Sequence, residues 1–127
     1  MLVRIKGQAP LAATAYDLFG GLSLNRTGGH FDGFQVALWP GGAAGRGVLL
    51  AGDQPQVCAV RRWVTFMYSY PNYIPLCPTA VKHVSSTLQA LGFERLYGAF
   101  PNRTILHDAR GAIARSADRY LRALAIT

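Results

Sequence analysis

Two glycine-flanked positions carry side chains that could bind a metal ion. His30 lies within Gly28-Gly29-His30-Phe31-Asp32-Gly33, and Asp53 follows the apolar segment Val48–Ala51 and Gly52. Glycines let the backbone turn sharply and bring an imidazole close to a ligand. A carboxylate at the end of a buried strand is costly unless it is paired or bound to a cation. Imidazole and carboxylate together suit zinc, iron or manganese, so the pattern predicts a metal site with His30 and Asp53 as ligands.

Each of these residues also has a structural interpretation. A histidine in a glycine turn is commonly a surface residue, and Asp53 could form an Asx turn or a helix cap before Pro55. The other histidines are His83, expected on the surface of a helix, and His107, a weaker candidate for a third metal ligand. The sequence places no Ser-His-Asp or Cys-His arrangement, so the catalytic residues stay unassigned and no organic cofactor site is predicted.

The first half of the chain is expected to position these residues on strands. Apolar or alternating runs occur at Tyr16–Phe19, Leu22–Arg26, Phe34–Trp39 and Val48–Ala51. Gly20-Gly21 is typical of a hairpin turn between the first two runs. We therefore expect a mostly antiparallel meander with one buried face, and the sequence separation of 23 from His30 to Asp53 allows both residues to reach one edge of it.

The second half of the chain alternates helices and strands. Pro78 to Leu91 has apolar residues at helical spacing, a proline in its first turn and Gly92 at its end. Phe93–Tyr97 and Thr104–Leu106 are strand candidates, and Asp108 is expected to cap a final helix from Ala109 to about Ala125. The fold class is thus α/β or α+β in layers, a mostly antiparallel sheet with C-terminal helices, forming one domain over residues 1–127. Residues 1–15 have little regular pattern and are expected to be a poorly ordered leader or a poorly anchored strand.

The segment from Val57 to Tyr73 is rich in aromatic residues. It shows no helical or strand period, so we expect a long structured loop with about one helical turn. Its aromatic side chains could line a substrate pocket or cover the core, and packing is the favoured interpretation. They are Trp63, Phe66, Tyr68, Tyr70 and Tyr73.

Composition excludes some classes of function. Half of the residues are hydrophobic and 15% are charged, which is typical of a folded domain. The net charge of +7 would suit an anionic partner, but the basic residues are scattered, and this favours a solvated basic face over nucleic-acid binding. No run is long enough to span a membrane, and no secretory signal is visible. Cys58 and Cys77 fit no metal-ligand spacing, so we expect free thiols in a cytoplasmic protein.

Several ordered motifs resemble one known family. Gly-Gly-His-Phe-Asp-Gly, the strand Phe34–Trp39 and Val48-Leu49-Leu50-Ala51-Gly52-Asp53 look like the second half of a metallo-β-lactamase-fold hydrolase. In that family a GHxxG turn supplies a metal-binding histidine, and a strand ending in Gly-Asp supplies a metal-binding carboxylate. His30 and Asp53 match these positions in order and spacing. The later segments Arg62–Asn72, Phe93–Gly98 and Ser116–Tyr120 resemble the same family, so the likeness covers about residues 16–125.

The same resemblance implies that the chain is incomplete as an enzyme. The family's HxHxDH motif, which supplies its first metal site, does not occur here, and Gly98-Ala99-Phe100 stands where a later histidine is usual. Catalytic zinc needs about three protein ligands. We therefore expect half of a metallo-β-lactamase αβ/βα sandwich, binding zinc, iron, manganese or no metal, and inactive as an isolated chain against small-molecule esters, thioesters, lactams or phosphoesters. The expected partners are the missing N-terminal half or a second copy. A structural or interaction protein that dimerises is the alternative, and a small basic nucleic-acid-binding domain is a third.

Overall fold

The first four strands form the antiparallel meander that the sequence predicts. The computed structural model describes residues 15–125, so the expected leader lies outside the described residues except for Ala15. The strands are β1 (Ala15–Asp17), β2 (Ser23–Arg26), β3 (Gln35–Trp39) and β4 (Val48–Leu50), each antiparallel to the next. In the turn after β1, Gly20 and Gly21 have φ of 61° and 77°, a left-handed conformation that glycine adopts without strain.

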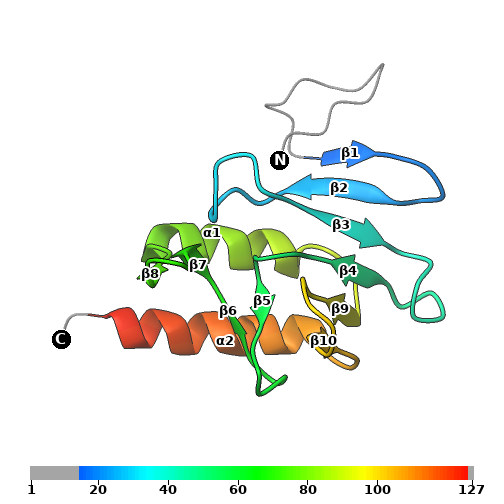
Figure 1. Cartoon of the computed structure of the whole chain (residues 1–127). Helices are drawn as coiled ribbons and strands as arrows, with labels where there is room; N and C mark the ends of the chain where they lie inside the picture. Colours follow the sequence, from blue (N-terminus) through cyan, green and yellow to red (C-terminus); the bar gives the residue numbers. More distant parts are fainter. Residues whose placement is uncertain (1–14, 126–127) are drawn as a thin grey trace.

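Two strands from the second half of the chain complete the main sheet. β9 (Arg95–Tyr97) lies parallel to β4, and β10 (Thr104–Ile105) pairs antiparallel with β9. The sheet order is β1-β2-β3-β4-β9-β10. The parallel connection from β4 to β9 contains α1 (Pro78–Gln89), and α2 (Ala109–Leu124) follows β10. Figure 1 shows the two helices side by side, so the fold is mixed α+β with a mostly antiparallel sheet.

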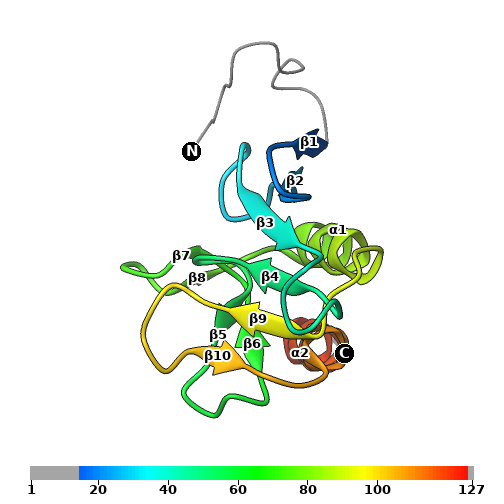
Figure 2. The ribbon, with the colours of Figure 1, turned by 90° about the vertical axis from the view of Figure 1, so that its right-hand side faces the viewer.

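Alternation along the strands separates two faces of the sheet. One face carries a row of paired apolar residues, Leu38, Leu49, Leu96 and Ile105, which belong to or pack against the buried core. Both helices lie on this side of β3, β4 and β9 (Figure 2), and bury residues such as Val81 and Ile113. The opposite face carries the row Leu24, Ala37, Leu50 and Tyr97. Of these, Leu50 is 39% exposed and Tyr97 is 36% exposed.

The ends of both helices agree with the local sequence signals. Pro78 occupies the first turn of α1, which ends at Gln89, slightly before the expected boundary at Leu91. Asp108 caps α2, because its side chain accepts a hydrogen bond from the Gly111 amide at 3.2 Å. The predicted cap is therefore confirmed, and it fixes the position at which the chain leaves β10 and enters α2.

The expected loop from Val57 to Tyr73 was the main error in secondary structure. It contains most of two small antiparallel hairpins instead of one loop with a helical turn. β5 (Gln56–Val57) pairs with β6 (Val64–Thr65), and β7 (Met67–Ser69) pairs with β8 (Ile74–Pro75). Strands of two or three residues are too short to show an alternating pattern, which is why the sequence did not reveal them.

Two simpler expectations concern the membrane and the cysteines. Within residues 15–125, none of the helices has the length and apolar character needed to cross a bilayer. Cys58 and Cys77 are both free thiols, as expected, and Cys77 is exposed.

Candidate functional site

His30 lies on a tight loop between β2 and β3, and this loop requires a left-handed backbone at the glycine before His30. Gly29, directly before it, has φ of 88°. A Cβ atom at this position would lie 2.5 Å from Oε1 of Gln54, so a larger residue would collide with that side chain. The glycine pair in the motif therefore has a structural reason: it lets the loop pass directly over Gln54.

Gln54 holds this loop in place. Its side chain is fully buried, and its Oε1 accepts a hydrogen bond from the His30 amide at 2.8 Å. Its Nε2 donates to Thr27 Oγ1 at 3.0 Å and to the Gly28 carbonyl at 2.6 Å. Three hydrogen bonds from one buried amide fix the loop relative to the end of β4. Sequence reasoning missed Gln54, and the only local signal was its position directly after Asp53.

The imidazole of His30 has a defined orientation. Its Nδ1 lies 2.5 Å from the Met67 carbonyl, which can only accept, so in the neutral ring Nδ1 carries the proton and Nε2 presents a lone pair. The ring also packs edge-on against Phe34, with 5.7 Å between ring centroids. The side chain is 15% exposed and lines a pocket, and its Nε2 faces Asp53.

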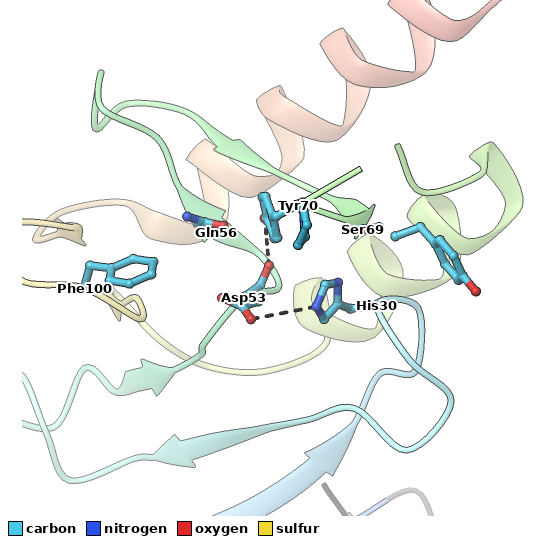
Figure 3. A pocket seen from close by; sticks show the side chains of 8 residues that line it. His30, Asp53, Gln56, Ser69, Tyr70 and Phe100 are labelled. Atoms are coloured by element: carbon cyan, nitrogen blue, oxygen red, sulfur yellow. Dashed lines mark hydrogen bonds and ion pairs between the residues drawn. The ribbon is translucent and has the colours of Figure 1, made fainter. Parts of the chain in front are cut away.

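Asp53 meets His30 from the loop after β4. The two side chains point toward each other (Figure 3), with Oδ2 of Asp53 3.8 Å from Nε2 of His30. The side chain of Asp53 is 47% exposed. The backbone carbonyl of Asp53 accepts a hydrogen bond from the Tyr70 hydroxyl at 3.0 Å. Burial, and next the negative charge of Asp53, raise the pKa of Tyr70 well above its usual range, so the hydroxyl keeps the proton that it donates. The predicted convergence of His30 and Asp53 is therefore observed.

The geometry of this pair fits two ligands of one divalent cation. Zinc bonds to nitrogen and oxygen of about 2.0–2.2 Å at a tetrahedral angle put the two ligand atoms about 3.4 Å apart. The observed 3.8 Å is close to this separation and too long for a direct hydrogen bond. A metal-binding histidine also commonly donates its second ring N–H to a backbone carbonyl, as Nδ1 does here to Met67. Within residues 15–125, the structure gathers no group of three or more metal-competent side chains.

A pocket of about 420 Å³ opens beside the pair. Its walls combine aromatic rings with a few polar groups, which is the usual character of a small-molecule site. It is lined by His30, Asp53, Gln56, Tyr68, Ser69, Tyr70, Pro71 and Phe100. The aromatic segment therefore divides between the two interpretations: Phe66 is fully buried in the core, whereas Tyr68 and Tyr70 line the pocket.

The other two histidines lie elsewhere. His107 is exposed after β10 and lines a separate depression with Arg61, Arg62 and Arg115. The structure therefore does not bring the candidate third ligand to the pocket of His30 and Asp53. His83 is exposed on α1, as expected.

Comparison with known proteins gives one informative similarity. The chain is 47% identical over 104 residues to an uncharacterized protein, YmaE, of Bacillus subtilis (strain 168). The aligned region makes up 82% of this chain but 38% of YmaE, so the chain spans little more than a third of that protein's length. No family model matches the chain, and no solved structure matches it either.

Proposed function

We propose that this chain is the C-terminal half of a metal-dependent hydrolase of the metallo-β-lactamase fold. In this proposal His30 and Asp53 supply two ligands to a metal site, and the remaining ligands come from polypeptide beyond these 127 residues. The observation that carries the proposal is the 3.8 Å approach of His30 Nε2 to Asp53 Oδ2.

The organisation around the two residues supports a binding role over a chance approach. Gln54 fixes the backbone of His30, the Met67 carbonyl fixes its ring, and Tyr70 holds the backbone of Asp53. None of these contacts uses Nε2 or the carboxylate oxygens, and both residues line the pocket. Holding ligands by surrounding hydrogen bonds is how proteins maintain metal sites.

The ligand count explains why the proposed activity needs more than this chain. Catalytic zinc sites use about three protein ligands and leave one position open. YmaE is much longer than the region it shares with this chain, which leaves room in such a protein for the other ligands. A cation bound there would act as a Lewis acid and make water a stronger acid. His30 and Asp53 would hold it, while Tyr68, Tyr70 and Phe100 would form the wall against a small ester, thioester, lactam or phosphoester substrate.

Metal titration tests this proposal directly. We expect the chain to bind Co²⁺ or Mn²⁺ weakly, and we expect His30→Ala and Asp53→Ala each to weaken binding about tenfold or more. Visible absorption of Co²⁺ and electron paramagnetic resonance of free Mn²⁺ measure the affinity. Cys77 is exposed, so every protein in the set should carry Cys77→Ser to remove binding by its thiolate.

The other two histidines provide matched controls. His83→Ala and His107→Ala each remove an exposed imidazole away from the pocket, so metal affinity should be retained. Equal affinities in the parent and in His30→Ala would mean that the metal binds elsewhere, and the proposed site would be wrong.

A second candidate function is supported by the outer face of the sheet. Leu24, Ala37, Leu50 and Tyr97 form an apolar row across four strands, and Trp39 beside it is 47% exposed. Such a surface suits a non-catalytic interaction protein that pairs with a second copy of itself. Sedimentation of the isolated chain tests this candidate: self-association is expected for a protein that pairs with a second copy, and not for a half-domain that needs a different polypeptide.

A further inference from the structure

A group of basic side chains lies on a different part of the molecule from the His30 pocket. Arg61 and Arg62 are in the turn between β5 and β6, Arg115 and Arg119 are on α2, and His107 precedes that helix. Arg61, Arg62, His107 and Arg115 line one depression of about 320 Å³. We call these five residues the basic cluster.

Trp63 organises three of these arginines. The guanidinium carbon of Arg119 lies 3.3 Å from the centroid of the Trp63 ring, and those of Arg62 and Arg115 lie 5.6 Å from it. Arg115 and Arg119 are one helical turn apart, so they project from the same face of α2. Cation–π contact with an indole stabilises each guanidinium in place. The result is three positive charges held around one ring.

Backbone contacts orient the guanidinium groups further. Arg115 donates to the Arg62 carbonyl at 2.9 Å, and Arg61 donates to the Asn102 carbonyl at 3.0 Å. The β5–β6 hairpin is itself attached to α2, because the Val64 amide donates to Ser116 Oγ at 2.9 Å in the protein interior. A guanidinium has five N–H donors, so one bond to a carbonyl leaves most of them available. The cluster is therefore preorganised and still able to bind an anion.

The charge of this cluster is not neutralised by neighbouring acids. Among residues 15–125, the basic partners of the ion pairs are Arg26, His30 and Arg122, and none of these belongs to the basic cluster. Asp108 also lines the depression, but its carboxylate accepts the Gly111 amide at the start of α2. Glu94 lies behind it and accepts the Asp108 amide. The depression is therefore lined by one carboxylate, that of Asp108, and by the three guanidinium groups of Arg61, Arg62 and Arg115. This leaves an excess of positive charge, and a bound anion would relieve the repulsion between the guanidinium groups.

We propose that the basic cluster binds a phosphate group of a phosphate-bearing ligand. Several guanidinium forks around one depression match the geometry and the multiple charge of phosphate better than the single charge of a carboxylate. The face of Trp63 is covered by Arg119 at 3.3 Å, so binding depends on the phosphate and not on stacking of a base on that ring. The phosphate could belong to a small compound or to a nucleic-acid backbone, and both present the same chemistry. This site is separate from the proposed metal site, so either proposal can fail alone.

Calorimetric titration with inorganic pyrophosphate, in phosphate-free buffer at about 0.15 M ionic strength, tests the site on the full 127-residue chain. A fluorescent single-stranded oligonucleotide, followed by anisotropy at several salt concentrations, forms the second arm. We expect saturable binding that Arg61→Gln/Arg115→Gln weakens about tenfold or more, because two charge-assisted hydrogen bonds are lost. Both positions are exposed and glutamine is polar, which limits the effect on folding.

Matched controls make the result decisive. Arg46→Gln/Lys82→Gln removes two exposed charges away from the cluster and should change affinity by less than about twofold, since screened long-range effects are small. His30→Ala should leave affinity unchanged. Circular dichroism melts check that each variant is folded. If Arg61→Gln/Arg115→Gln is not folded, the single substitution Arg61→Glu replaces it, because Arg61 lies in an exposed turn.

The two arms then identify the source of the phosphate. If the oligonucleotide binds more tightly than pyrophosphate, and its affinity falls with salt as steeply as contact with several phosphates requires, the ligand is a nucleic-acid backbone. If pyrophosphate binds and the oligonucleotide has little affinity, the ligand is a small phosphate compound. The proposal is overturned if neither probe binds saturably, or if the control double variant weakens binding as much as Arg61→Gln/Arg115→Gln does.

Discussion

The candidate site residue His30 depends on a few hydrogen bonds from a buried side chain. The loop that carries His30 packs its rings against Phe34, and Gln54 connects its backbone to the end of β4 through three hydrogen bonds. Buried polar groups that lose a partner cost far more than exposed ones, because water cannot replace the lost bond. The backbone position of His30 therefore depends on Gln54.

Replacing Gln54 should accordingly destabilise the protein. Gln54→Ala leaves the His30 amide without its partner and removes one hydrogen bond each from the Thr27 hydroxyl and the Gly28 carbonyl, which keep only their bond to each other. We expect a loss of about 3 kcal/mol in the free energy of unfolding. Urea denaturation measures this loss.

Gln56 offers a matched comparison for that experiment. Its buried Oε1 has no hydrogen-bond partner within the described part of the chain. Gln56→Leu should therefore be nearly neutral, because it removes an unsatisfied polar group and keeps similar volume. A loss for Gln54→Ala no larger than that for Gln56→Leu would contradict the holding role assigned to Gln54.

At the level of elements, the start of α2 contributes both to the stability of the helix and to the depression of the basic cluster. Asp108 has a left-handed backbone, with φ of 52°, and its side chain caps the helix while also lining the depression of the basic cluster. Asparagine readily adopts this backbone conformation and can keep the cap, whereas alanine adopts it less readily and has no side chain to cap the helix.

The two substitutions at Asp108 should therefore separate stability from binding. Asp108→Ala should lower the free energy of unfolding by about 1 to 2 kcal/mol in urea denaturation, because the cap is lost. Asp108→Asn should keep most of the stability and, if the cluster binds phosphate, tighten pyrophosphate binding by removing the only carboxylate on its wall among residues 15–125. Weaker pyrophosphate binding by Asp108→Asn would count against a site governed by positive charge.

At the level of the whole molecule, the sheet has one covered face and one apolar face with exposed residues. The helices cover Leu49 and Leu96, while Leu50 and Tyr97 point to the opposite side of the same strands. An apolar face of this kind favours association, with another copy or with a different polypeptide.

Sedimentation velocity should therefore detect self-association of the isolated chain as its concentration rises. Leu50→Lys should shift the equilibrium to monomer, because a charge at the centre of the apolar row is costly to bury. Val60→Lys adds the same charge at an exposed position in the β5–β6 turn and should leave association unchanged. A parent chain that is monomeric at every concentration would exclude the second candidate function.

Hydrolytic activity of the isolated chain is the other property of the whole molecule. We expect weak or no turnover of generic ester or lactam substrates with added zinc or manganese, because two ligands leave most of a cation's coordination to water. Water on the aqua ion of zinc has a pKa of about 9, compared with about 7 in catalytic sites. His30→Ala should then change little in any residual rate. Robust metal-dependent turnover that His30→Ala abolishes would show that the site is complete without another chain.

Local signals in the sequence were sufficient for much of the fold. The glycine pair at Gly20-Gly21, the proline at the start of α1 and the cap at Asp108 all act within a few residues, so the meander and both helices were predictable. The same holds for His30 and Asp53, since each follows a strand at a glycine and the intervening chain has the right length to return. The family resemblance itself stays a prediction.

Tertiary structure alone decided the remaining features, because they depend on residues far apart in the chain. Gln54 reaches a loop 24 positions away, and the carbonyl that orients His30 comes from Met67, 37 positions away. Arg115 meets the β5–β6 turn across 53 positions. Their partners are backbone groups, which every residue possesses and which carry no sequence signature. Short hairpins such as β5–β6 likewise form because they pack on α2, so their two-residue strands exist only in the folded protein.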